Sequence, residues 1–232
     1  MPVTAPYPSV LLTHARREDC VRQLARDLAL QVASMLSRQA RASLLLPGGS
    51  SPQQLLPCLA AEPLEWARVD VSPTDERWVA ADAEQSNWRL LQQGLSATCC
   101  LDPRQAHTAQ ASASLWADQL QSRMPFAAVL LGMGEDGHFA SLFPGMPGLA
   151  EALDLHAAPA ALCAQAPSEP RQRLSLNLAM LLQTQWLGLL AFGQSKKQLL
   201  DAVLADAPQS RRLPLHALLT AGRLPLRMYW AP

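Results

Sequence analysis

Six short apolar runs recur along the chain, and helical patterns lie between them. Apolar runs of this length are typical of strands that are buried on both faces of a sheet. Strands that alternate with helices form mainly parallel sheets with helices on both faces, and we predict such an α/β fold here. The predicted strands are Val10–Leu12, Ser43–Leu46, Val69–Val71, Phe126–Leu131, Trp186–Phe192 and Arg227–Trp230.

The helices are predicted from apolar positions at helical spacing and from start signals. Ser51 is a candidate N-cap with Pro52 at the first helical position, so one helix should begin near Gln53. Arg173–Leu178 alternates polar and apolar residues, which indicates a strand or a strand-to-helix corner. No linker or repeat interrupts the pattern, so residues 1–232 are interpreted as one domain. The predicted helices cover Arg17–Gln39, Ser86–Leu95, Thr108–Met124, Met180–Gln185, Lys197–Ala205 and Pro214–Thr220.

The charge balance argues against nucleic acid as a main partner. Of the 232 residues, 19 are Lys or Arg and 19 are Asp or Glu, so the formal net charge is zero. Duplex-binding proteins usually carry a basic excess. Hydrophobic residues make up 49% of the chain, which is ample for a folded core. No apolar run approaches the roughly 20 residues that a membrane-spanning helix needs, so no membrane partner is expected.

The five cysteines are scattered and form no C-x-x-C pair. Their odd number and spacing favour neither a disulfide framework nor a zinc site, and no histidine motif with metal-ligand spacing occurs. We therefore predict no metal and a cytoplasmic protein with reduced thiols. Met1–Pro8 lacks the basic start and apolar core of a signal peptide.

Four polar loops follow predicted strands, and ligands bind at the carboxyl ends of parallel strands. We expect these loops to converge on one pocket, although each alone could be an ordinary turn. The loops are Gly48-Gly49-Ser50, Asp75-Glu76-Arg77, Asp136-Gly137-His138 and Gly193–Lys196.

The loop after the second strand has the residue types of a phosphate cradle. Gly48 and Gly49 would expose backbone N–H groups, Ser50 would add a hydroxyl, and the next helix would point its positive end at the ligand. The lysine of a nucleotide-binding G-x-x-x-x-G-K-[ST] loop is missing, so a phosphate monoester fits better than a nucleoside triphosphate. An ordinary strand-to-helix turn has the same composition.

His138 is the candidate general base. No G-x-S-x-G elbow or electropositive cysteine turn supplies a protein nucleophile, which favours a histidine that acts on water. Either Glu135 or Asp136 could orient its imidazole. Arg77 could hold a carboxylate, a phosphate or a developing oxyanion, and a salt-bridged surface loop is the alternative.

Several motifs together resemble the 6-phosphogluconolactonases. They are Leu-Pro-Gly-Gly-Ser-Ser-Pro, Thr-Asp-Glu-Arg-Trp-Val, Ser86-Asn87-Trp88, Gly-Met-Gly-Glu-Asp-Gly-His-Phe-Ala-Ser-Leu-Phe-Pro, Arg173-Leu-Ser-Leu and Gly193-x-x-Lys196. They occur in the family's order over nearly the whole chain. Phe139 stands where threonine is common, and Pro47 stands where a small residue is usual.

The resemblance implies a Rossmann-like fold and hydrolysis of a small phosphorylated sugar lactone, 6-phosphogluconolactone, to 6-phosphogluconate in the oxidative pentose phosphate pathway. It implies no cofactor and no metal. His138 would be the base and Asp136 its partner, with Arg77 at the oxyanion. Asp75 would position the sugar hydroxyls or support Arg77. The remaining substrate- and phosphate-binding positions would be Gly48, Gly49, Ser50, Asn87, Arg173 and Lys196. A monomer or a small homo-oligomer is expected.

Two alternatives remain. Sugar-phosphate isomerase–deaminases share the glycine loop and the Asp-Gly-His turn, but the resemblance places a glutamate five residues after the histidine, where this chain has Phe143. A non-catalytic sugar-phosphate sensor would need a DNA-binding module. Only about ten residues precede the first predicted strand, too few for a helix-turn-helix.

Overall fold

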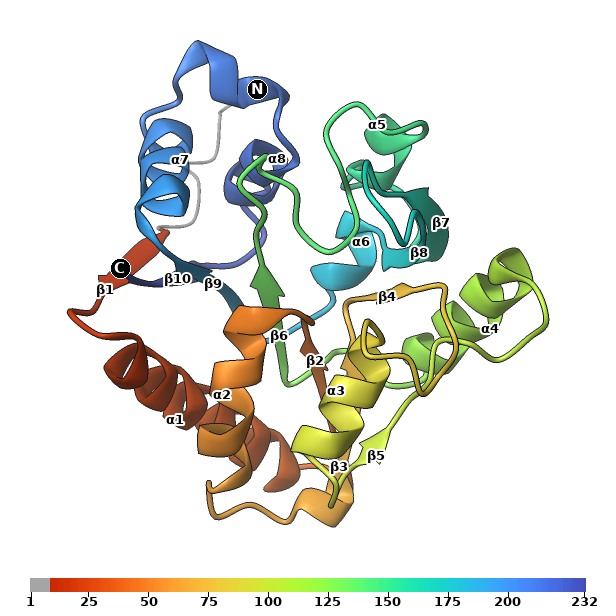
Figure 1. Cartoon of the computed structure of the whole chain (residues 1–232). Coiled ribbons are helices and arrows are strands. Elements are labelled where there is room, and N and C mark those ends of the chain that lie inside the picture. Colours follow the sequence, from red (N-terminus) through yellow and green to blue (C-terminus); the bar gives the residue numbers. More distant parts are fainter. Residues whose placement is uncertain (1–8) are drawn as a thin grey trace.

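The computed structural model describes residues 9–232 and contains a central seven-stranded sheet, which Figure 1 shows in the middle of the molecule. Met1–Pro8, where a signal peptide was not expected, lie outside the described residues. Every neighbouring pair of strands in this sheet is parallel, in the order β1-β10-β9-β6-β2-β3-β5. The strands are β1 (Val10–Thr13), β2 (Ala42–Leu46), β3 (Val69–Pro73), β5 (Cys99–Cys100), β6 (Ala128–Gly132), β9 (Leu187–Phe192) and β10 (Leu226–Ala231). The predicted parallel α/β fold is confirmed.

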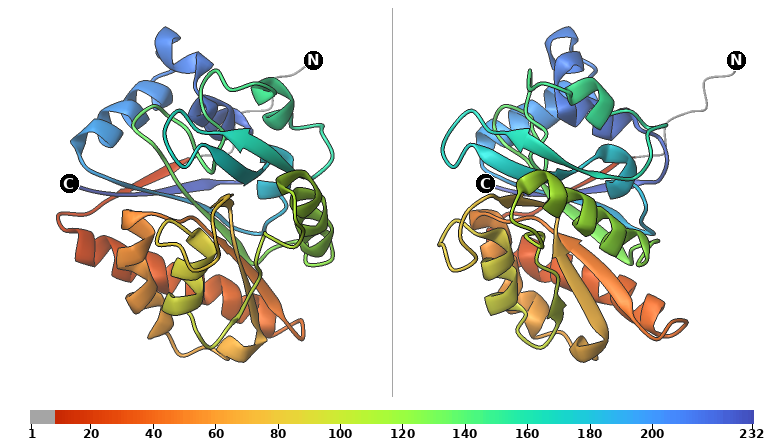
Figure 2. Two further views of the ribbon diagram at one scale, coloured as in Figure 1. Left: turned by 45° about the vertical axis from the view of Figure 1, so that its right-hand side comes forward. Right: turned by 90° about the vertical axis from the view of Figure 1, so that its right-hand side faces the viewer.

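Helices cover both faces of the sheet, as predicted (Figure 2). They are α1 (Arg17–Leu36), α2 (Ser50–Ala60), α3 (Asn87–Gly94), α4 (Ala109–Gln121), α5 (Leu149–Ala152), α6 (Leu178–Leu181), α7 (Gln194–Leu204) and α8 (Pro214–Thr220), with short 3-10 helices at Trp66–Arg68 and Pro208–Arg212. No helix within residues 9–232 is both long and apolar enough to cross a membrane.

Alternate residues of the central strands pack into two hydrophobic cores, one on each face of the sheet. Leu44 and Leu130 pack with α1, α2 and α3, whereas Leu45 and Val129 pack with α4, α7 and α8. Successive strand side chains point to opposite faces, so a strand between two cores must be apolar at every position. This is why most of the strands are nearly continuous apolar runs in the sequence, with β3 and its buried Asp70 as an exception.

A second, three-stranded antiparallel sheet was not predicted. Its order is β4-β8-β7, from β4 (Asp75–Arg77), β8 (Gln172–Leu176) and β7 (Ala161–Gln165). The interpretation of Asp75–Arg77 as a loop was therefore wrong. Three charged residues carry no strand periodicity, and β4 exists because the distant strand β8 pairs with it. Arg77 lies opposite Arg173 in this pairing.

Three helices, α2, α6 and α7, begin earlier than predicted, and two of them, α2 and α7, are capped by a glycine with positive φ. Gly49 has a φ of 98° and caps α2, which starts at Ser50; Ser51 is not the N-cap. Gly193 has a φ of 92° and caps α7, which starts at Gln194 instead of Lys197. Only glycine adopts this backbone geometry readily, so the chain turns from strand to helix within three residues at α2 and within one residue at α7. Ser50 and Lys196 thus lie in first helical turns that face the edge of the sheet.

The strand order reverses between β2 and β6. From β2 the chain proceeds outward through β3 and β5, then returns to β6 on the other side of β2 and continues through β9 and β10. In open parallel sheets the carboxyl ends at such a reversal leave a crevice where ligands bind. The two loops at this point carry Gly48-Gly49 and Gly134–His138.

Candidate active site

A cleft of about 230 Å³ opens at the carboxyl ends of β2, β6 and β9. Its walls bring together Gly48, Gly49, Ser50, Asp75, Arg77, Asn87, His138 and Lys196, all of them predicted from the sequence. Asp136 and Arg173 were predicted as well but do not line the cleft. The four strand-end segments therefore converge as expected. Asp136 contacts the lining residue His138, and Arg173 on β8 lies opposite the lining residue Arg77. The remaining walls are Pro47, Ser51, Pro52, Gly132, Met133, Gly134, Ala140 and Leu190.

Asp136 is the carboxylate that contacts His138. Its Oδ1 lies 2.6 Å from Nδ1 of the imidazole and also accepts a hydrogen bond of 3.2 Å from the backbone N–H of His138. Gly137 has a φ of 79°, which folds the loop back so that both groups meet. Glu135 points elsewhere and accepts a 2.8 Å hydrogen bond from Ser195 Oγ at the start of α7. A carboxylate at Nδ1 keeps the proton there, so Nε2 is left as the basic nitrogen.

Two further contacts fix the imidazole ring. The ring of Phe143 lies 4.4 Å from that of His138, centroid to centroid, with the planes tilted by 45°. Gly134 leaves the space that the pair occupies, because a Cβ there would fall 2.3 Å from His138 Nδ1 and 2.5 Å from Asp136 Oδ1. His138 is therefore held by packing and by hydrogen bonding before any ligand arrives.

Asp75 joins the β4 side of the cleft to the histidine loop. Its Oδ2 accepts a 2.6 Å hydrogen bond from Ser141 Oγ, and its backbone oxygen accepts one of 2.7 Å from Asn87 Nδ2. Ser141 is buried, and the sequence analysis assigned it no role. A serine beside the histidine motif does not indicate that it will contact the distant Asp75. A Cβ on Gly48 would fall 1.7 Å from Asn87 Oδ1, so the glycine is needed for close approach of that amide.

Three cations at the cleft have no ion-pair partner among residues 9–232: Arg77, Arg173 and Lys196. Burial lowers the pKa of Lys196, as does nearby Arg17, while Glu135 opposes the shift. Burial also lowers the pKa of Arg173, and the charge of Arg77 adds to this. The buried Nε of Arg77 and the buried Nε of Arg173 donate to no described group. Cations that are partly desolvated and unpaired favour an anionic ligand.

The start of α2 supplies a second anion-binding feature on the same cleft. Gly49 and Ser50 line the wall, and the first N–H groups of the helix lack intrahelical acceptors. The N-terminal end of the helix also carries partial positive charge. Together with Lys196 this arrangement suits a phosphate group. No three His, Cys, Asp or Glu side chains of the described chain are grouped to hold a metal ion.

Comparison with known proteins identifies relatives over nearly the whole chain. The family model described as glucosamine-6-phosphate isomerases/6-phosphogluconolactonase matches residues 15–228. The 6-phosphogluconolactonase of Pseudomonas aeruginosa is 39% identical over 218 residues, covering 91% of this chain and 90% of that protein. The 6-phosphogluconolactonase of Caulobacter vibrioides is 35% identical over 247 residues, covering both chains completely.

Solved structures agree with these relatives. The crystal structure of a 6-phosphogluconolactonase from Shewanella baltica has a TM-score of 0.87 and 28% identity, and the match covers 97% of this chain and 98% of that one. A monomeric glucosamine-6-phosphate deaminase has a TM-score of 0.75 at 17% identity, covering 96% of this chain and 97% of that one, which shows the shared fold alone.

Proposed function

The chain belongs to the glucosamine-6-phosphate isomerase/6-phosphogluconolactonase family, and from this premise we infer that it hydrolyses 6-phosphogluconolactone to 6-phosphogluconate in the oxidative pentose phosphate pathway. The composition of the cleft is the observation that supports this inference. A His138–Asp136 pair lies in the same cleft as a phosphate-type anion site. A lactone hydrolase of a phosphorylated sugar needs these two elements together.

We propose that His138 activates water. Nε2 takes a proton from the water as its oxygen attacks the lactone carbonyl carbon, and the imidazolium then returns a proton to the ring oxygen as the ester bond breaks. Asp136 holds the imidazole and stabilises its charged form, as a carboxylate at Nδ1 does in other histidine bases. The mechanism requires neither a cofactor nor a metal.

Arg77 is the proposed donor to the oxyanion, because it lines the cleft and its guanidinium has no ion-pair partner among residues 9–232. Asp75, fixed by Ser141, would position sugar hydroxyls, with Asn87 beside it. Gly48, Gly49, Ser50 and Lys196 would bind the phosphate. Arg173 would add positive charge from behind Arg77.

Phe143 separates this proposal from an isomerase–deaminase. The ring packs against the imidazole and is 8% exposed, so the position offers no carboxylate to shuttle protons during sugar ring opening. The same contact supports a histidine that is held in one orientation for attack by water.

The direct test is hydrolysis of freshly generated 6-phosphogluconolactone, measured as the rate above spontaneous opening. We expect clear turnover of this lactone and a much higher KM for unphosphorylated gluconolactone, which lacks the anchoring phosphate. A protein that is thermally stabilised by 6-phosphogluconate but leaves the spontaneous rate unchanged would be a sensor, contrary to the proposal.

Replacing Lys196 with alanine should raise KM roughly 10- to 100-fold with little change in kcat, the usual effect of losing a charged hydrogen bond to a remote group. Lys197→Ala is the matched control, because Lys197 pairs with Asp201 at 2.7 Å and does not line the cleft. Equal KM values for the two variants would remove Lys196 from the phosphate site.

The lowered pKa of Lys196 also predicts a pH effect on product binding. A lysine binds phosphate only when protonated, so its contribution is complete below its pKa and is lost as the pH rises through that value. Because burial lowers this pKa, the affinity for 6-phosphogluconate should begin to fall at a lower pH than with an ordinary lysine. Lys196→Arg should move this loss to higher pH in calorimetric titrations.

We further propose a cytoplasmic, single-domain protein that is a monomer or a small homo-oligomer. All five cysteines are unpaired, and Cys99 and Cys163 are exposed, which fits a reducing compartment. Both hydrophobic cores pack on opposite faces of one sheet, which supports one folding unit. Light scattering would measure the oligomeric state.

A further inference from the structure

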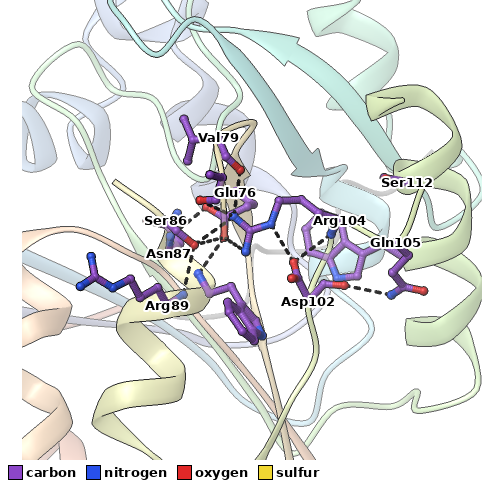
Figure 3. Close-up of polar contacts among 12 residues, drawn as sticks. Glu76, Val79, Ser86, Asn87, Arg89, Asp102, Arg104, Gln105 and Ser112 are labelled. Carbon is purple, nitrogen blue, oxygen red and sulfur yellow. Dashed lines mark hydrogen bonds and ion pairs between the residues drawn. The ribbon is translucent and has the colours of Figure 1, made fainter. Parts of the chain in front are cut away.

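Glu76 is a fully buried carboxylate that lies in the chain between Asp75 and Arg77, two residues that line the cleft. Figure 3 shows Glu76 among its polar contacts. Its Oε1 accepts hydrogen bonds from the backbone N–H groups of Arg77 at 2.7 Å and Asn87 at 2.8 Å. Its Oε2 accepts from the N–H of Trp88 at 2.7 Å and from Ser86 Oγ at 3.1 Å. One side chain therefore joins β4 to the first turn of α3.

Arg104 is the counter-ion of this carboxylate. Its Nη2 lies 3.7 Å from Glu76 Oε2, and its Nη1 donates to Ser86 Oγ at 3.1 Å. Asp102 holds the guanidinium from the other side through a 2.9 Å contact with Nε. The side chain of Arg104 is only 9% exposed, and its guanidinium lies over the ring of Trp88. The pair is thus enclosed between β4, α3 and the segment that follows β5.

We propose that Glu76, with Arg104 as its counter-ion, is a positioning residue that sets the spacing of Arg77 and Asn87 across the cleft. The proposal rests on the proposed function, in which those two residues contact the substrate. A single oxygen that accepts from both backbone N–H groups fixes both residues relative to each other. Neither Glu76 nor Arg104 lines the cleft, so their effect passes through the residues that they hold.

The charge of Glu76 is essential to this arrangement. An ionised carboxylate accepts four hydrogen bonds, whereas a protonated one turns one oxygen into a donor and loses acceptors. Burial raises the pKa of Glu76, and the N–H groups of Trp88, Asn87 and Arg77 oppose the rise, as does Arg104. Arg173 on β8 and Cys100 on β5 also interact electrostatically with this carboxylate, and Asp102 lies beyond Arg104.

Glu76→Gln is the sharpest test. The amide keeps the shape, but its NH2 group faces two donors in place of an acceptor, so the strand and the helix start must separate. We expect kcat/KM to fall about tenfold or more, with a higher KM and weaker binding of 6-phosphogluconate, since unpaired buried donors cost this much. The protein should remain folded by circular dichroism.

Asp70→Asn is the matched control. Asp70 lies near the amino end of β3, whereas the cleft lies at the carboxyl ends of the strands. Asp70 is buried and pairs with Arg41 at 2.6 Å and with Arg123 at 3.1 Å. It should lose comparable thermal stability but keep wild-type kinetic constants. If Glu76→Gln also loses stability and keeps its kinetic constants, Glu76 serves the fold alone and the proposal is wrong.

Arg104→Met and Arg104→Lys give a second readout, which remains available if Glu76→Gln fails to fold. In Arg104→Met the positive charge is lost, so the pKa of Glu76 rises further. As the pH is lowered, Glu76 is then protonated earlier, and binding of 6-phosphogluconate should weaken at a higher pH than in the wild type. Arg104→Lys keeps the charge and should restore the wild-type profile. If the affinity for 6-phosphogluconate fell at the same acidic pH in Arg104→Met and in Arg104→Lys, the proposal would be overturned. A wild-type protein without turnover or product binding would instead overturn the proposed function.

Discussion

His138→Ala lowers kcat at least about 100-fold while the protein still binds 6-phosphogluconate. This is the expected result, because loss of a general base removes a factor of roughly 10² to 10⁴ and leaves the phosphate anchor intact. The structure supports the size of the effect, since Asp136 and Phe143 hold the imidazole in one orientation in the cleft. The measurement is the initial rate of lactone hydrolysis above the spontaneous rate.

A second histidine–aspartate pair provides the control for this variant. His216 Nε2 lies 3.0 Å from Asp206 Oδ1, and neither residue lines the cleft. His216→Ala should therefore keep wild-type kcat. Near-wild-type hydrolysis by His138→Ala would contradict the assignment of His138 as the base, because spontaneous opening is already subtracted.

Gly134→Ala should reduce kcat on a similar scale although it removes no chemical group. The new Cβ would lie 2.3 Å from both Cε1 and Nδ1 of His138 and 2.5 Å from Asp136 Oδ1, closer than Cβ contacts occur in proteins. The pair must move, and a shift of about 1 Å in a catalytic group can cost a factor of roughly 10². Steady-state kinetics beside thermal unfolding would separate this loss from unfolding.

Gly94→Ala is the steric counterpart away from the cleft. Gly94 is the last residue of α3, and a Cβ on it would lie 2.6 Å from Cδ1 of Leu56 on α2. Its cost should appear as a lower Tm with kcat retained. If Gly134→Ala kept wild-type kcat, the loop would be able to adapt, and the idea of a rigidly held imidazole would have to be abandoned.

The sheet could be predicted because its strands are buried on both faces, which leaves nearly continuous apolar runs in most of them. The convergence of four loops followed from parallel strands whose carboxyl ends share one edge. The start of α2 could not be placed, since Ser51-Pro52 carries ordinary capping signals while the actual cap depends on the positive φ of Gly49. A backbone angle of this kind is not encoded in residue type alone.

The partners of the site residues were harder to predict than the residues themselves. Glu135 and Asp136 are adjacent and chemically alike, and only the turn at Gly137 decides which one meets His138. Ser141 contacts Asp75 across 66 positions of sequence. Glu76 is buried in β4, a strand that forms only because β8 pairs with it. Such contacts depend on long-range pairing and leave no local pattern.

The packing of Phe143 on His138 has a consequence for any change of chemistry at this site. By the resemblance described above, a change from water attack toward sugar isomerisation would place a carboxylate where this ring now lies. The first such substitution would remove the apolar neighbour of the imidazole and put an unpaired charge at a buried position. Under the proposed function, such a variant should therefore hydrolyse the lactone more slowly than the wild type.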